Sequence, residues 1–210
     1  PYTTLFRSGP CIPDYPPQVV DSDDDGVSDD EETSYGSNPE DPGHLPVFQA
    51  EGATIHALNG AEVTIEAGSL PQNVVVVKVG TPGTIPAGTI PGDKHASAAA
   101  LSLDPDGTIF SIPVQVSLPY SPAAINGLQE SSLTAVYFNG TNYAADGIAD
   151  VSVDPAAHVI SFSATHFTDF LVAGDYTDAD GDGVPDLDDA FPYNPLGATD
   201  SDGDGLGDEW

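Results

Sequence analysis

Between residues 47 and 173, apolar side chains recur at every second position in short runs separated by Gly, Pro and Asn. The runs at 114–118 (VQVSL) and 159–164 (VISFSA) each place their apolar residues on one side of an extended chain. Over these residues the sequence does not sustain the 3.6-residue period of an amphipathic helix. The pattern therefore predicts β-strands, most of them with one buried face.

Two Asn-Gly pairs, at 59–60 and 139–140, each separate two such runs, and Asn-Gly is a preferred two-residue turn of a β-hairpin. The run at 74–79 (VVVVKV) is unbroken, which is typical of a strand covered on both faces. Roughly eight to ten strands in about 125 residues predict an all-β fold, an antiparallel β-sandwich over residues 47–174.

Charge separates this middle region from its flanks. The chain has 34 acidic and 3 basic residues and a formal net charge of −31. Twenty-two of the acids fall within residues 21–41 and 175–209, and 11 fall within 47–173. Such a charge disfavours nucleic acid and anionic membranes as partners and favours cations.

The acidic flanks contain one motif three times, as DSDDDGVSDDEE from Asp21, DADGDGVPDLDD from Asp178 and DSDGDGLGDEW from Asp200. Acids stand at positions 1, 3, 5 and 9, glycine at 6, an aliphatic residue at 7, and an acid at 12 where the chain reaches that far. Calcium takes six to eight oxygen ligands, and a tight loop supplies them from alternate side chains and the backbone carbonyl of position 7. Glycine at position 6 permits the sharp turn that wraps the chain around the ion.

The motif thus predicts three Ca²⁺ sites. Their expected ligands are Asp21, Asp23, Asp25, Val27 (by its carbonyl), Asp29 and Glu32 in the first loop; Asp178, Asp180, Asp182, Val184 (by its carbonyl), Asp186 and Asp189 in the second; and Asp200, Asp202, Asp204, Leu206 (by its carbonyl) and Asp208 in the third. Magnesium fits less well because it gives up its water reluctantly.

The alternative interpretation is a solvated acidic linker, but a random acidic tract would not repeat the glycine and the aliphatic residue in every copy. An EF-hand needs a helix on each side of its loop. Pro39 and Pro42 follow the first loop, and Pro192 and Pro195 follow the second, so we expect neither loop to lie in a helix pair. The same prolines argue against a cellulosome-type docking module, which would need helices after the loops.

With YGSNPEDPG after the first loop and DAFPYNP at the end of the second, the flanks resemble bacterial thrombospondin type 3 repeats. That resemblance covers residues 21–43 and 178–210 and implies calcium-dependent spacers in extracellular proteins. The middle region, with GAEVTIEAGSLPQNVVVVKV, LDPDGTIFSIPVQVSLPY, LTAVYF and ATHFTDFLVAG, resembles the β-sandwich domain shared by netrin receptors, ankyrins and zonula occludens proteins. This second resemblance implies a structural or interaction domain without a catalytic site.

One tripeptide leaves an enzymatic alternative open. His166-Phe167-Thr168 resembles the HFS at which some relatives of that domain cleave themselves. The resemblance implies an N-to-O acyl shift, with Thr168 Oγ1 as nucleophile and His166 handling the proton. The competing interpretation, which we favour, is a final strand that closes the sandwich and has no enzymatic role.

The ends of the chain read as cuts. Residues 1–8 match a translated sequencing adaptor, the chain has no Met, and it stops inside the third motif, so we expect a fragment of a longer protein. We divide it into this adaptor (1–8), a linker with one repeat (9–46), the sandwich (47–174) and two repeats, the last truncated (175–210).

The one cysteine, Cys11, can form no intrachain disulfide. His44, His56, His95 and His158 are scattered, with no carboxylate or cysteine at ligand spacing.

These observations together predict a calcium-binding structural or adhesion segment of a secreted or cell-surface protein. Its expected partners are calcium ions and neighbouring domains of the same chain, with surface proteins or glycans as further candidates. No run of the sequence approaches the roughly 18 apolar residues of a membrane span.

Overall fold

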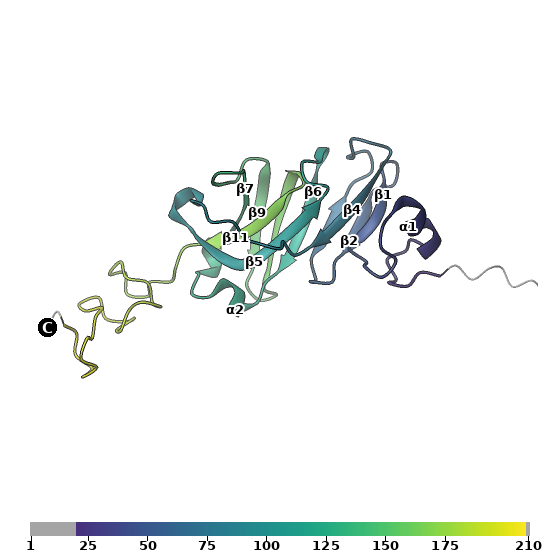
Figure 1. Ribbon diagram of the computed structural model, residues 1–210. Coiled ribbons are helices and arrows are strands. Elements are labelled where there is room, and N and C mark those ends of the chain that lie inside the picture. The colour runs from purple at the N-terminus through teal and green to yellow at the C-terminus, as the bar shows by residue number, and fades with distance from the viewer. Residues whose placement is uncertain (1–19, 209–210) are drawn as a thin grey trace, which may run out of the picture.

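The computed structural model describes residues 20–208. Residues 1–19 and 209–210, which include the adaptor-like segment and Cys11, lie outside the described part of the chain. Within it, the middle region forms two antiparallel sheets packed face to face, with an acidic segment at each end (Figure 1). The prediction of an all-β fold is confirmed.

The described residues form eleven strands. Sheet A contains, in spatial order, β1 (His44–Phe48), β4 (Val74–Gly80), β5 (His95–Asp104), β11 (Asp169–Gly174), β7 (Thr134–Phe138) and β8 (Tyr143–Ala144). Sheet B contains β2 (Ala53–His56), β3 (Glu62–Ile65), β6 (Ile109–Pro119), β10 (Val159–His166) and β9 (Ile148–Asp154). The helical elements are short: α1 (Asp29–Tyr35), η1 (Pro91–Asp93), α2 (Pro122–Ile125) and η2 (Glu130–Ser132).

The alternating residues of the strands meet between the sheets. In β6 and β10, the apolar residues predicted to share a face are all buried, from Val114 at 0 % exposure to Leu118 at 3 %. Phe162 of β10 and Phe170 of β11 contact each other across the two sheets, with ring centroids 5.1 Å apart. The period-two pattern therefore identified the core correctly on both of these strands.

Both predicted hairpins are present. β2 pairs with β3 and β7 pairs with β8, each antiparallel. The turn residues Gly60 and Gly140 have φ of 82° and 96°, which a residue with a side chain rarely adopts.

The expectation that residues 74–79 form a strand covered on both faces is wrong. Val75, Val77 and Val79 of β4 are buried, but Lys78 is exposed. Burial therefore alternates along β4 as it does along the neighbouring strands. The run of valines reflects the preference of branched side chains for strands more than burial on both faces.

A proline- and glycine-rich strap, residues 81–90, crosses part of the outer face of sheet A. The strap is attached to β8, since Tyr143 N–H donates to the Thr89 carbonyl at 3.0 Å and Tyr143 Oη donates to the Pro86 carbonyl at 2.7 Å. Ile90, the last residue of the strap, packs with Leu171 and Val136 of the sheet in a second, smaller apolar cluster. The strap thus keeps the apolar outer residues of β11 and β7 out of water.

The acidic loops lie at opposite ends of the sandwich. Figure 1 shows α1 and the first loop beside β1 and β2, whereas the second and third loops extend away from the far end. Among residues 20–208, no helix is long and apolar enough to cross a membrane.

We predict that Phe162→Ala destabilises the sandwich by about 3–5 kcal/mol, because it leaves a cavity where two aromatic rings meet. Urea unfolding of the variant and the parent chain measures the difference. Ile109→Ala on β6 is the control, since Ile109 is 70 % exposed and its truncation should change stability by no more than about 0.5 kcal/mol. Equal losses in both variants would contradict the assignment of the core.

Candidate metal centres

The carboxylates at positions 1, 3 and 5 come together in all three loops. Asp21, Asp23 and Asp25 each offer an oxygen within 4.8 Å of the other two. The corresponding groups are Asp178, Asp180 and Asp182, and Asp200, Asp202 and Asp204. These nine predicted ligands are therefore grouped as the motif requires.

The loops converge because each acid binds the backbone of its own turn through one oxygen. In the first loop, Asp21 Oδ2 accepts the Gly26 N–H at 3.1 Å, Asp23 Oδ1 the Asp25 N–H at 3.3 Å, and Asp25 Oδ1 the Val27 N–H at 2.7 Å. The second and third loops repeat all three bonds, with Val184 and Leu206 as the donors at position 7. These turns use one oxygen of each carboxylate, except that Asp178 and Asp200 use both, because a second oxygen of each accepts the position-4 N–H at 2.8 Å.

The acids at position 9 close the loops. Asp29 accepts hydrogen bonds from the Ser22 N–H and hydroxyl, both at 2.8 Å, and Asp186 accepts the Ala179 N–H at 2.7 Å. Asp208 accepts both the N–H and the hydroxyl of Ser201, and these bonds hold its pKa below the usual range. The structure thus places the position-9 acids on the position-2 backbone, outside the groups formed by positions 1, 3 and 5.

Two positions in each loop have a left-handed backbone. Position 6 was expected from the sequence and has φ of 93° at Gly26 and 95° at Gly183. Position 4 was not expected, yet Asp24 has φ of 59° and Gly181 has φ of 78°. The signal was the glycine at position 4 in the second and third loops, and aspartate is among the few other residues that tolerate this conformation.

Glu32, the acid at position 12 of the first loop, is fully buried. Glu32 is 0 % exposed, and neither of its carboxylate oxygens has a hydrogen-bond partner. Burial, then repulsion from Asp25 and Asp23, raises its pKa to about 7. Burial likewise raises the pKa of Asp23 and of Asp25.

Glu32 lies on α1, a helix that the prolines after the first loop had argued against. Ser28 caps α1 by accepting the Glu31 N–H, and the left-handed Gly36 ends it before Pro39. The view that a helix cannot follow the loops is therefore wrong for the first loop. The residues that precede this loop, 1–19, lie outside the described part of the chain, so the expectation that the loop does not lie in a helix pair stays a prediction.

The donor set fits a hard cation. Two unit charges 4 Å apart repel by about 1 kcal/mol in water and by about 4 kcal/mol near a protein surface. A buried ionised carboxylate without a partner is costlier still. The unpartnered buried oxygens of the first loop lie on Asp21, Asp23, Asp25 and Glu32, and those of the second lie on Asp180 and Asp189. A cation bound among these oxygens would neutralise the charge that the surrounding protein leaves uncompensated.

The second loop is fastened to the sandwich just after β11. Thr177 donates to the Gly127 carbonyl through its N–H at 2.8 Å and through its hydroxyl at 3.1 Å. Tyr176 stacks on His95, with ring centroids 3.9 Å apart. Leu187 covers Gly127 so closely that a Cβ there would meet Leu187 Cδ1 at 2.3 Å.

The residues of the cleavage alternative do not form a nucleophile-base pair. His166 ends β10 in one sheet and Asp169 begins β11 in the other, so Phe167 and Thr168 lie at the crossing between the sheets. The His166 ring lies against Tyr137, with centroids 4.7 Å apart, and Phe167 is 0 % exposed. Among the described residues, no hydrogen bond joins the Thr168 hydroxyl to His166. His166 and Thr168 therefore do not belong to one strand.

Of the other histidines, two have carboxylate partners that sequence spacing did not reveal. His158 Nδ1 lies 3.0 Å from Glu130 Oε1, and His56 Nδ1 lies 3.4 Å from Glu62 Oε2. Each joins separate elements of the sandwich, and neither contributes to a grouped set of acids.

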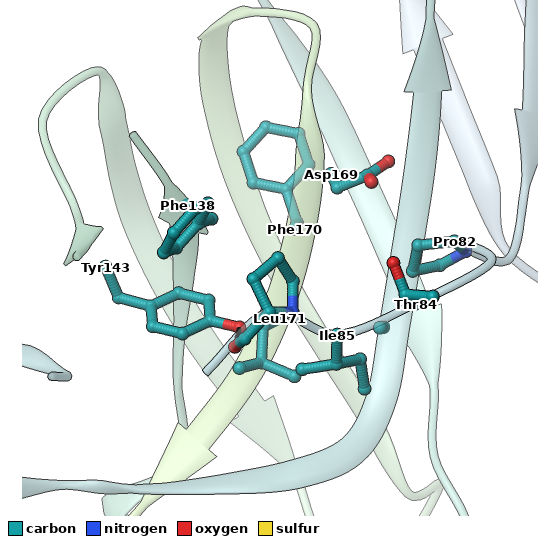
Figure 2. A pocket seen from close by; sticks show the side chains of 10 residues that line it. Pro82, Thr84, Ile85, Phe138, Tyr143, Asp169, Phe170 and Leu171 are labelled. Carbon is teal, nitrogen blue, oxygen red and sulfur yellow. Dashed lines mark hydrogen bonds between the residues drawn. The ribbon is translucent and has the colours of Figure 1, made fainter. Parts of the chain in front are cut away.

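A pocket on the outer face of sheet A is too small for an ordinary ligand. Its walls are Ile85 and Pro82 of the strap with Phe138, Tyr143 and Leu171 of the sheet, and Asp169 lies at its edge (Figure 2). Its volume of about 90 Å³ compares with roughly 300–1,000 Å³ for typical small-molecule sites. It could take a single apolar group.

A scan against models of protein families finds no match to this chain, and a search of curated proteins finds none either.

We predict that Gly127→Ala loosens the second loop from the sandwich, because the new Cβ would overlap Leu187. Hydrogen exchange of the Thr177 amide, which is bonded to the Gly127 carbonyl, should become faster by about tenfold or more. Gly107→Ala is a matched control, since Gly107 has the same φ of 78° but has nothing within 4 Å of a new Cβ. Unchanged exchange in Gly127→Ala would show that Leu187 does not hold the loop.

We also predict that the chain stays intact between Phe167 and Thr168. Mass spectrometry after prolonged incubation should find the full-length mass alone. A product pair that divides at this bond, and that disappears in Thr168→Val, would restore the autoproteolytic alternative.

Proposed function

We propose that this chain is a calcium-binding structural segment of a larger secreted or cell-surface protein. Calcium would stiffen the acidic repeats, and these would hold an interaction-type β-sandwich at a fixed position relative to neighbouring domains. The single observation that best supports this proposal is Glu32, a fully buried carboxylate whose two oxygens have no hydrogen-bond partner.

The chemistry of the loops favours calcium. Each offers only carboxylate and carbonyl oxygens, which suit a hard cation, and the first loop has enough of them for the high coordination number that calcium accepts. Calcium sites in extracellular modules work at roughly 10⁻⁴–10⁻³ M, so an extracellular location would supply enough calcium for loops of this kind. The resemblance of the flanks to thrombospondin type 3 repeats supports the same assignment.

The placement of the loops supports a spacer. One loop precedes the first strand of sheet A and two follow its last strand, at opposite ends of the sandwich (Figure 1). The second loop continues directly from β11 and is bonded to the α2–η2 segment through Thr177. An ion that orders this loop would therefore also fix the direction in which the chain leaves the sandwich.

We propose the sandwich itself as a protein-interaction or structural domain. Its resemblance to the domain of netrin receptors, ankyrins and zonula occludens proteins supports this role. The cavity beneath the strap, of about 90 Å³, offers room for one side chain of a partner.

We predict that calcium raises the free energy of unfolding and protects both flanks from proteolysis. A ligand at 100 times its dissociation constant stabilises the state that binds it by about 2.7 kcal/mol. Thermal unfolding and limited proteolysis, each with calcium and with a chelator, measure these effects.

The combined variant Asp23→Asn and Asp180→Asn should lose most of this protection, because each change removes a central charge from one loop. Asp106→Asn together with Asp154→Asn is the control, since both are exposed acids of the sandwich outside the loops. The proposal fails if the parent chain gives the same melting temperature and cleavage pattern with calcium and with chelator.

A further inference from the structure

The acid at position 12 differs between the two complete loops, down to individual oxygen atoms. In the first loop, Glu32 Oε1 and Oε2 are both buried, and neither accepts a hydrogen bond. In the second loop, Asp189 Oδ1 accepts the Phe191 N–H at 2.7 Å, and Oδ2 alone is buried without a partner. Glu32 therefore has two uncommitted oxygens and Asp189 has one, and neither acid belongs to the group of three within 4.8 Å in its own loop.

The acid at position 1 differs in the same direction. Asp21 uses Oδ2 to accept the Gly26 N–H, and its Oδ1 is buried without a partner. Asp178 uses both oxygens, accepting the Gly181 N–H at 2.8 Å and the Gly183 N–H at 3.0 Å. The first loop thus keeps more of its oxygens free than the second.

The two loops also differ in their number of buried carboxylate oxygens that have no hydrogen-bond partner. The first loop has five buried carboxylate oxygens without a partner, namely Asp21 Oδ1, Asp23 Oδ2, Asp25 Oδ2, Glu32 Oε1 and Glu32 Oε2. The second has two, Asp180 Oδ2 and Asp189 Oδ2, and a third uncommitted oxygen, Asp182 Oδ2, that is more accessible to solvent. With the Val27 carbonyl, the first loop could surround an ion almost entirely with protein oxygens, whereas the second would leave coordination positions to water.

The first loop and its helix also pack against the sandwich. Val27 packs against the main core, and Tyr35 at the end of α1 contacts Phe48 of β1 edge to face, with ring centroids 5.4 Å apart. Glu32 lies between these two anchors in the sequence. These contacts would resist a contraction of the loop around a smaller ion. In the second loop, Asp189 is followed by a turn instead of a helix.

We propose that the two complete loops differ in ion selectivity: Glu32 makes the first loop selective for calcium over magnesium, and Asp189 leaves the second loop able to hold either ion. Calcium accepts six to eight oxygens at about 2.3–2.6 Å, whereas magnesium requires six at about 2.0–2.1 Å and retains several of its waters. A rigid site with little room for water therefore excludes magnesium, and a wetter one tolerates it. The inference rests on the proposed function, since it presupposes that the loops bind divalent cations.

Each loop provides its own reporter. The position-6 amide donates to the position-1 carboxylate, in the pairs Gly26 with Asp21 and Gly183 with Asp178. An ion that binds the carboxylate will shift the resonance of that amide, so ¹⁵N-edited NMR of the whole chain follows the two loops separately. The probes are Ca²⁺ alone, Mg²⁺ alone, and Ca²⁺ in the presence of millimolar Mg²⁺.

We expect Gly26 to respond to calcium at a concentration at least about tenfold below that needed for Gly183, and to stay unmoved by millimolar magnesium. Gly183 should respond to both ions. The inference is overturned if magnesium shifts both amides at the same concentration, or if Gly183 responds to calcium before Gly26. If calcium shifts neither amide, the proposed function itself fails.

Exchanging the two acids tests whether position 12 is the cause. Glu32→Asp should lower the calcium preference of the first loop by about tenfold or more, and Asp189→Glu should raise that of the second. Glu31→Asp and Asp188→Glu make the same exchanges at exposed neighbouring positions and should change neither. The resonances of the sandwich check that each variant is folded. Selectivity that persists in folded Glu32→Asp would overturn the role of Glu32.

Discussion

Repulsion between carboxylates is the constraint on which the ends of this molecule depend. In each loop, acids at alternate positions bind the local backbone through at least one oxygen, and an oxygen from each of the three lies within 4.8 Å of the other two. The backbone bonds give the loop its shape but neutralise little charge, because a backbone N–H carries only a partial positive charge. The remaining oxygens converge, and in the first loop they are also buried, where water screens them least. A cation converts this repulsion into attraction and would thereby determine whether the segment is ordered.

In the proposed function, the sandwich would be the rigid body whose position relative to neighbouring domains an ordered loop fixes. The first loop leads through α1 into β1 at one edge of sheet A, and the second continues from β11 near the middle of the same sheet. Leu187 above Gly127 and Tyr176 against His95 tie the second loop to the frame by packing as well as by hydrogen bonds. A rigid joint of this kind transmits orientation, whereas a solvated acidic linker would only add length.

Much of this arrangement was readable from the sequence, because the relevant patterns are local. Alternation identified the inner faces of β6 and β10, Asn-Gly pairs identified two hairpins, and the spacing of Asp21, Asp23 and Asp25 identified a convergent set of oxygens. Other features were less accessible. The seven-residue α1 had a capping signal in Ser28 and Glu31, which the following prolines obscured. The contact between Gly127 and Leu187, the one-sided burial of β4 and the crossing between sheets at Phe167 depend on tertiary packing between distant segments, which no local pattern encodes.

Isothermal titration calorimetry of the chain with calcium, after removal of metal by a chelator, tests the central claim most directly. If a divalent cation neutralises the clustered aspartates, the titration will give a saturable heat with at least two ions bound per chain, one for each complete loop. The same titration with Asp23→Asn and Asp180→Asn combined should lose most of that heat. A parent chain that gives no heat of association at millimolar calcium would contradict the account, because its acidic loops would then be ordered, if at all, without an ion.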